Sequence, residues 1–149
     1  MGLFDFAANI GRKLFSSEDE ADAKIREHIE DNNPGVENLK VEVKDGVATL
    51  SGEAESAEAL EKAVLMAGNV KGISEVVASN VNAPTSEVEV EYYEIASGDS
   101  LWKIAAEHLG DGNRYPEIFE ANREVIQDPD LIFPGQKIRI PRDSEGQIA

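Results

Sequence analysis

The side chains that usually perform catalysis are few in this 149-residue chain and form no known catalytic pattern. Cysteine is absent, and His28 and His108 stand far apart with no second ligand beside either. No nucleophile elbow, zinc-binding helix motif or phosphate-binding loop is present. The acids Glu18–Glu20 are typical of a solvated helix start, and Asp128–Asp130 lacks the further ligands of a calcium loop. We therefore expect that the protein is not an enzyme.

The charge balance disfavours two classes of partner. The chain carries 14 Lys and Arg against 30 Asp and Glu, a formal net charge of −16. Residues 1–83 and 84–149 carry −8 each (8 basic against 16 acidic, and 6 against 14), so neither half has a basic stripe. Nucleic acid and anionic membranes are therefore unexpected partners. No stretch approaches the length of a membrane span, and we expect a monomer.

Residues 1–19 predict a short amphipathic helix. Leu3, Phe6, Ile10 and Leu14 recur at helical spacing, and Gly11 lies near the end of the pattern. The polar residues among them exclude a secretory signal, which favours a protein of the cytoplasm. Such a helix could lie on a membrane or dock on the protein itself. The acidic residues that follow it favour docking.

Residues 20–83 predict the order helix, strand, strand, helix, strand. The first helix starts at Ser17–Glu20 and ends near Asn32–Gly35. The hairpin Leu39–Ser51 follows, then an alanine-rich helix over Ser56–Ala67 and a third strand over Ile73–Val81. This pattern is typical of a small α+β domain.

The hairpin turn fixes a register that can be checked. Asp45-Gly46 is a strong signal for a two-residue turn, which pairs Lys44 with Val47. The pairing puts the apolar side chains on one face of the sheet and the polar ones on the other. The further pairs that we expect are Val43–Ala48, Val41–Leu50 and Leu39–Gly52.

Residues 92–142 predict strand, helix, helix, strand. Ser97–Ser100 is a turn that delivers a helix N-cap, and Gly110 ends that helix. Asn113 and Pro116 open a second helix. Its expected inner face consists of Tyr115, Ile118, Phe119 and Asn122. In the last strand, Ile138 and Ile140 alternate with Lys137 and Arg139, which predicts a strand with one face in water.

The stretch Tyr93–Pro141 resembles the LysM family. The motifs that carry the resemblance are Y-x-I-x-S-G-D-S-L-W-x-I-A, F-E-A-N and D-P-D-L-I-F-P-G-Q-K-I-R-I-P. The resemblance implies a βααβ fold, and many members of the family bind N-acetylglucosamine polymers such as peptidoglycan through two loops. The residues of these loops here are Gly98, Asp99, Ser100 and Leu101, and Asp130, Leu131 and Ile132. In the alternative interpretation, most of them are helix caps and core residues.

The preceding part resembles the BON domain, through V-x-D-G-V-A-T-L-S-G and G-N-V-K-G-I-x-x-V. We therefore expect an α+β chain: an N-terminal helix (1–19) packing on an αββαβ BON domain (20–83), a linker (84–91), a βααβ LysM domain (92–142) and a tail (143–149). One BON and one LysM domain in a short chain that starts M-G-L-F-x-F resembles the family of small cytoplasmic bacterial potassium-binding proteins. The resemblance implies selective binding of K⁺, with Rb⁺ or Cs⁺ as substitutes, a conformational response and no catalysis.

Backbone carbonyl groups suit such a site. Selective K⁺ sites surround the weakly hydrated ion with neutral carbonyl oxygens, whereas carboxylate clusters favour divalent ions. The last carbonyls of a helix are free to act as ligands, and the chain offers two such ends, Ala7–Gly11 and Gly68–Ile73. Pattern alone favours Gly68 and Gly72 as ordinary helix-stop and turn residues, and the resemblance of the whole chain reverses this preference. By the resemblance, the expected ligands are the carbonyls of Ala7, Ile10, Gly68, Val70 and Ile73.

Two functions follow as hypotheses. In the first, K⁺ docks the N-terminal helix and compacts the chain, because buried carbonyls that face one another without the ion are costly. In the second, the chain is an envelope protein that binds peptidoglycan through its LysM loops. The second function needs export, and the N-terminus offers no route for it.

Overall fold

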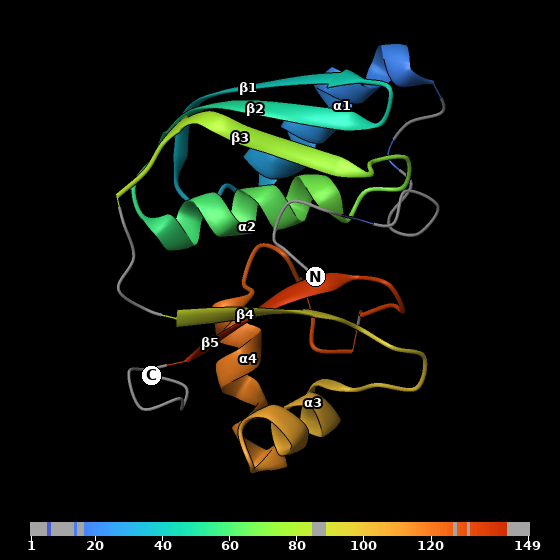
Figure 1. Cartoon of the computed structure of the whole chain (residues 1–149), viewed down its shortest axis with the longest axis vertical. Helices are drawn as coiled ribbons and strands as arrows, with labels where there is room; N and C mark the ends of the chain where they lie inside the picture. The colour runs from blue at the N-terminus through green and yellow to red at the C-terminus, as the bar shows by residue number, and fades with distance from the viewer. Residues whose placement is uncertain are drawn as a thin grey trace.

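The computed structural model describes residues 6, 14, 17–84, 89–126, 128–130 and 132–142. It contains two α+β units that follow one another along the chain (Figure 1). The α+β class and the order of elements expected from residue 17 onward are confirmed. The helix expected within residues 1–19 lies almost wholly outside the described residues. Phe6 and Leu14 are described, and both pack against the core of the first unit.

The first unit contains α1 (Glu18–Asp31), β1 (Val36–Lys44), β2 (Val47–Ala54), α2 (Ala57–Gly68) and β3 (Glu75–Asn82). The strand order is β1-β2-β3, with β1 antiparallel and β3 parallel to β2. A parallel neighbour requires a crossover, and α2 provides it. The two helices contact each other, and their buried residues share one core with the inner face of the sheet.

The hairpin register is confirmed over most of its length. Lys44 pairs with Val47, Val43 with Ala48 and Val41 with Leu50. The expected pair Leu39–Gly52 is wrong, because the register shifts between Glu37 and Lys40. Asn38 adopts a φ of 55° at this irregularity. A Cβ at position 52 would lie 2.7 Å from the carbonyl oxygen of Glu37, so glycine permits the close approach of the two strands.

The second unit contains β4 (Glu89–Glu94), α3 (Leu101–His108), the short 3₁₀ turn η1 (Gly112–Arg114), α4 (Tyr115–Ala121) and β5 (Lys137–Arg142). Strand β4 begins inside the range expected for the linker. It pairs antiparallel with β5 to form a two-stranded ribbon. The N-cap expected at the start of α3 is confirmed, because the Ser100 side chain accepts a hydrogen bond from the backbone N–H of Lys103 at 3.1 Å.

The core of the second unit is small and aliphatic. Ile104, Ile118, Ile138 and Ile140 are fully buried in it. The inner face expected for α4 is confirmed except at Tyr115, whose side chain is 38% exposed. Tyr115 is the first residue of α4 and directly follows η1.

Helix α2 lies between the two sheets (Figure 1). One side of it packs on β2 and β3, and the other side faces the β4–β5 ribbon. The prediction that Lys137 and Arg139 face water is therefore wrong. The two residues are only 1% and 3% exposed, because α2 covers their face of the ribbon. The alternation of apolar and basic residues correctly predicted that Lys137 and Arg139 share one face of the ribbon. It could not predict that α2 covers this face.

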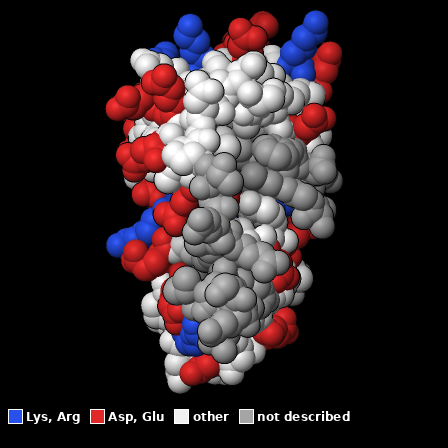
Figure 2. All heavy atoms as spheres, turned by 60° about the vertical axis from the view of Figure 1, so that its left-hand side comes forward, with Lys and Arg blue, Asp and Glu red and all other residues white. Residues whose placement is uncertain are grey.

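Among the described residues, no helix is both long and apolar enough to pass through a bilayer. Figure 2 shows one side of the molecule, on which acidic side chains outnumber basic ones. Three basic residues, Lys62, Lys137 and Arg139, are buried on or beside α2. They take part in the contact between the two units.

Candidate functional site

The turn between α2 and β3 holds three of the residues expected to bind K⁺. Gly68 is the last residue of α2, and Asn69 caps the helix by donating its backbone N–H to the carbonyl of Leu65 at 3.0 Å. Val70 and Ile73 follow in a tight turn and are fully buried. The structure therefore brings the Gly68, Val70 and Ile73 backbones into one short, buried segment at the C-terminal end of a helix.

The last carbonyls of α2, including that of Gly68, carry the negative end of the helix dipole. The Gly68 carbonyl has no N–H partner inside α2, because the helix ends there. The Val70 carbonyl accepts a hydrogen bond from the N–H of Ile73 at 3.1 Å. A carbonyl oxygen has two lone pairs, so this bond leaves room for a second partner. Gly72 adopts a φ of 105°, which allows the sharp turn between them.

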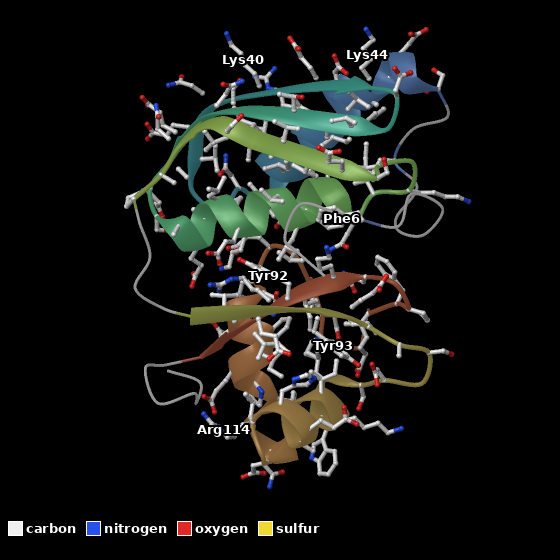
Figure 3. The ribbon with its side chains drawn as sticks, viewed as in Figure 1. Phe6, Lys40, Lys44, Tyr92, Tyr93 and Arg114 are labelled. Atoms are coloured by element: carbon white, nitrogen blue, oxygen red, sulfur yellow. The ribbon has the colours of Figure 1, made fainter. Side chains whose placement is uncertain are left out.

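The N-terminal segment reaches the same turn through Phe6 (Figure 3). The Phe6 backbone N–H donates to the carbonyl of Ser74 at 3.0 Å, and the edge of its ring lies against Gly68. A Cβ at position 68 would come within 2.1 Å of the ring, so the contact requires glycine. The other two expected ligands, Ala7 and Ile10, lie outside the described residues.

The chemistry of this turn suits a monovalent cation better than a divalent one. In the described part of the chain, no group of three or more His, Asp or Glu side chains could hold a metal ion. The turn offers neutral backbone oxygens instead. Neutral oxygens suit a large, weakly hydrated cation, whereas Ca²⁺ and Mg²⁺ sites usually include carboxylates.

Asn69 also joins the two units, which sequence reasoning missed. Its side chain acts as a short piece of strand: Oδ1 accepts from the N–H of Lys137 at 2.8 Å, and Nδ2 donates to the carbonyl of Lys137 at 2.7 Å. Asn122 does the same for Arg139, with both bonds at 2.8 Å. The second unit is therefore bonded to the residue between two expected ion ligands.

The Lys137 side chain lies beside the turn as well. It is 1% exposed, and its ammonium nitrogen lies over the Phe6 ring, 4.4 Å from the ring centroid. A cation over an aromatic face is attracted by the ring quadrupole. No basic residue occurs in the last turn of α2, so this lysine brings a positive charge from the other unit to that helix end.

A cluster of ion pairs fastens the middle of α2 to the ribbon. The Arg139 guanidinium contacts Glu61 at 2.9 Å and Glu58 at 3.3 Å, and it donates to the Ala121 carbonyl at 3.1 Å. Tyr92 of β4 faces α2 (Figure 3) and hydrogen-bonds Glu61. Burial, and then the negative charge of Glu61, raise the pKa of Tyr92 well above its usual value.

Lys62 adds a second bridge between the units. Its ammonium contacts Glu124 at 2.8 Å and Glu58 at 3.4 Å, and its side chain is 8% exposed. Glu124 adopts a φ of 67°, a conformation that non-glycine residues rarely take. The signal that could have revealed this contact is the set Glu58, Glu61 and Lys62, which projects charge from a helix whose other residues are largely apolar.

The first loop expected to bind glycan is stabilised by its own side chains. The Asp99 carboxylate accepts from the Tyr93 hydroxyl at 2.5 Å and from the Ala96 N–H at 2.8 Å. Lys103 donates to the Gly98 carbonyl at 3.2 Å. Leu101 is 2% exposed and belongs to the core.

The Tyr93–Asp99 hydrogen bond shifts the pKa of both groups. It is the main cause that raises the pKa of Tyr93 to about 12 and lowers the pKa of Asp99. The Tyr93 ring also contacts His108 edge-on, with 4.9 Å between ring centroids. His108 in turn lies 3.5 Å from the carboxylate of Glu91. These contacts organise the start of the second unit and form no metal site.

The second loop is described at Asp130 and Ile132, while Leu131 lies outside the described residues. The Asp130 N–H donates to the side chain of Asp128 at 2.8 Å, which fixes the turn that follows α4. Ile132 packs against the core of the second unit. In this arrangement the side-chain and backbone groups of both loops hold the loops in shape.

Comparisons with known proteins support both domain assignments. The model of the BON domain matches residues 17–91, and the model of the LysM domain matches residues 93–141. An uncharacterized protein of Deinococcus radiodurans is 36% identical over 102 residues, which cover 62% of this chain and 40% of that protein. The uncharacterized protein YqbP of Bacillus subtilis is 34% identical over 59 residues, or 34% of this chain and 27% of that protein.

A third relative matches along almost the whole chain. The protein named Potassium binding protein Kbp, from Escherichia coli, is 35% identical over 150 residues, which cover 96% of this chain and 100% of that protein. Both domains, in the same order, lie within this match. The chain therefore belongs to the BON–LysM family that includes Potassium binding protein Kbp.

Proposed function

We propose that this protein binds K⁺ through backbone carbonyls at the end of α2 and responds by becoming more compact. The observation that carries the proposal is the 35% identity to a protein named for potassium binding, over 96% of this chain. Rb⁺ and Cs⁺ are the expected substitutes, because they too are large and weakly hydrated. The protein is a cytoplasmic ion-binding protein in this proposal and catalyses no reaction.

The proposed ligands are the carbonyls of Gly68, Val70 and Ile73, completed by those of Ala7 and Ile10. The turn supports this proposal because it is buried and lies at the negative end of α2. The hydrogen bond from Phe6 to Ser74 brings the N-terminal segment to the turn. A bound ion would relieve the repulsion among carbonyl oxygens that face each other, and so would hold the segment in place.

Compaction follows from the position of Asn69. The residue lies between two proposed ligands, and its side chain makes two hydrogen bonds to Lys137 of the second unit. An ion that fixes the backbone of the turn also fixes the direction of the Asn69 side chain. Binding of K⁺ then stabilises the docked arrangement by mass action.

Calorimetric titration with KCl tests the proposal directly. NaCl and MgCl₂ at matched ionic strength are the controls. Saturable heat with K⁺ and none with Na⁺ is the expected result. Equal, non-saturating responses to all three salts would reduce the effect to screening of an acidic surface and would refute a selective site.

A pair of glycine variants tests the location of the site. Gly68→Ala places a Cβ against the Phe6 ring and should displace the N-terminal segment, with at least about a tenfold loss of K⁺ affinity. Gly112→Ala is the matched control, because its Cβ would collide with the Trp102 ring at 2.2 Å in the other unit. Equal effects of the two variants on K⁺ affinity would contradict the proposed location.

Peptidoglycan binding is the second candidate, and the match of residues 93–141 to the LysM domain favours it. The proposed contacts are Gly98–Leu101 and Asp130–Ile132. Sedimentation with purified peptidoglycan tests it, with and without KCl. Cell fractionation separates the candidates further, because the glycan function needs the protein in the envelope and the potassium function places it in the cytoplasm.

A further inference from the structure

The turn between α2 and β3 is bonded to a second turn, the Asp45-Gly46 turn of the β1–β2 hairpin. The Gly46 carbonyl accepts hydrogen bonds from the backbone N–H of Ser74 at 2.8 Å and from that of Glu75 at 3.4 Å. The Ser74 hydroxyl donates to the same oxygen at 3.3 Å. Both turns lie at one end of the first sheet (Figure 1). A single carbonyl of the hairpin therefore holds the segment that directly follows the proposed ion ligands.

The bond to Ser74 sets the direction of the Ile73 carbonyl. The Ile73 C=O and the Ser74 N–H belong to the same peptide unit, which is planar and trans, so the two groups point in opposite directions. Because the N–H is directed at Gly46, the Ile73 carbonyl points away from the hairpin. The same rule applies to Gly68, since the N–H of Asn69 is bonded back into α2 at 3.0 Å. The Gly68 carbonyl therefore points beyond the end of the helix.

The approach of the two turns depends on glycine in the hairpin. A Cβ at position 46 would lie 3.2 Å from the Ser74 hydroxyl oxygen and 3.3 Å from the carbonyl oxygen of Gly72. Gly46 also adopts a φ of 80°, which side chains other than glycine rarely tolerate. The Gly72 carbonyl thus lies against the hairpin, on the side opposite to the direction of the Ile73 carbonyl.

We propose that Gly46 is a positioning residue of the K⁺ site, because its carbonyl fixes the Ile73–Ser74 peptide unit and so aims the Ile73 carbonyl at the ion. This inference rests on the proposed potassium site. The carbonyl of Ser74 in turn accepts the N–H of Phe6 at 3.0 Å, so the same residue also places the N-terminal segment. The hairpin is then a third segment of the site, and it orients ligands without supplying one.

Gly46→Ala tests this role. Its Cβ must displace the Ser74 hydroxyl or the Gly72 carbonyl, and the φ of 80° adds strain, so the two turns should separate. Calorimetric titration with KCl should show at least about a tenfold loss of affinity, as is usual when a contact that orients a metal ligand is lost.

Gly35→Ala is the matched control. Gly35 precedes β1, so it lies at the opposite end of that strand from Gly46. It also has a positive φ, 125°, and its Cβ would lie 2.7 Å from the side chain of Glu55. The variant should lower the thermal stability of the first unit and leave the K⁺ affinity within about twofold of the unaltered protein. An equal loss of affinity in the two variants would overturn the inference.

A measurement on the unaltered chain covers the case in which Gly46→Ala does not fold. An ion bound to the Ile73 carbonyl polarises the peptide unit, which makes the Ser74 N–H a stronger donor to Gly46. The Ser74 amide proton should therefore move downfield in nuclear magnetic resonance spectra when KCl replaces NaCl at equal ionic strength. The amide of Asn32 is the reference, because it caps α1 through a bond to Ile29 at 3.2 Å and should not move. A Ser74 proton that moves no more than that of Asn32, in a protein that binds K⁺, would contradict the inference.

The outcomes also distinguish this inference from the potassium function. If the unaltered protein shows saturable binding of K⁺ and Gly46→Ala binds the ion as tightly, the hairpin does not position the site and the proposed function stands. If the unaltered protein binds no K⁺, the proposed function fails and the inference fails with it.

Discussion

The two faces of the β4–β5 ribbon are both buried, and they are held in opposite ways. One face presents Ile138 and Ile140 to the helices of its own unit, and contact there is aliphatic. The other presents Lys137 and Arg139 to α2 of the first unit, where the contacts are ion pairs and amide hydrogen bonds. A two-stranded ribbon with no packed face would be only marginally stable, so the second unit depends on the helices that cover its aliphatic face.

A polar strand face therefore does not imply a solvated face. Apolar contacts are non-directional and tolerate small changes of geometry. The hydrogen bonds and ion pairs on the charged face instead require particular partners at particular positions. Buried ion pairs also contribute less net stability than apolar packing, because desolvation offsets much of their attraction. We therefore expect the aliphatic face to determine whether the second unit folds, and the charged face to determine whether the two units stay together.

Truncation on the aliphatic face should have the largest effect. Ile138→Ala leaves a cavity in a fully buried site and should destabilise the second unit by about 3 kcal/mol. Urea denaturation followed by the fluorescence of Trp102, the only tryptophan, reports this unit. The loss should not depend on NaCl concentration. A loss of stability that depended strongly on NaCl concentration would contradict the distinction between the aliphatic and the charged face.

Removal of the charge on the opposite face should have a smaller effect that depends on salt. Arg139→Met leaves Glu61, 12% exposed, without its main cationic partner, and should cost about 2 kcal/mol at low salt. Part of this loss should disappear at high NaCl, because screening weakens the contribution of the pair. Arg123→Met is the control, since Arg123 and Glu120 form an exposed pair and should contribute less than about 0.5 kcal/mol.

The two asparagines test the contrast between the faces further, because they make the same bonds to two alternate residues of β5, Lys137 and Arg139. Asn69→Ala should cost about 1.5 kcal/mol and separate the units, which small-angle scattering detects as a larger radius of gyration. Asn122→Ala removes bonds inside the second unit, and should lower its stability without separating the units. Equal changes in radius for both variants would show that the joint does not depend on Asn69.

The smallest expected effect is alkaline and lies within the second unit. The pKa of Tyr93 is raised to about 12, so the folded state holds this proton more tightly than the unfolded state does. The stabilisation of the folded state by the protonated Tyr93 hydroxyl is therefore complete below pH 10, and it is lost as the pH rises toward 12. Tyr93→Phe should cost about 1 kcal/mol at pH 8 and weaken this alkaline loss. Denaturation curves at pH 8 and pH 11 measure both effects.

Local signals in the sequence predicted the elements well. The Asp45-Gly46 turn fixed the register of the first hairpin, because a two-residue turn leaves one pairing that keeps the apolar side chains together. Ser56 and Ser100 marked helix starts through their side-chain oxygens. The register shift near Asn38 escaped prediction, because the bulge depends on contact between two strands and not on either strand alone.

The contact between the units could not be predicted in the same way. The alternation of apolar and basic residues in β5 showed that Lys137 and Arg139 point away from the core of their own unit. No pattern near them in the sequence indicated which residues they contact. Their partners, Asn69 and Glu61, lie 68 and 78 residues earlier. The candidate ion site was predicted as a turn through Gly68 and Gly72. The arrival of Phe6 and Lys137 at that turn depends on the packing of three separate segments.

The asparagine pair has a consequence for how copies of this chain meet one another. Strand β5 has β4 on one side, and on its other side Asn69 and Asn122 bind the backbone groups of Lys137 and Arg139. Those backbone groups would otherwise form an open sheet edge, which can recruit a strand from a neighbouring molecule. Docking of the two units thus protects the protein against self-association, and a chain whose units have come apart loses half of that protection.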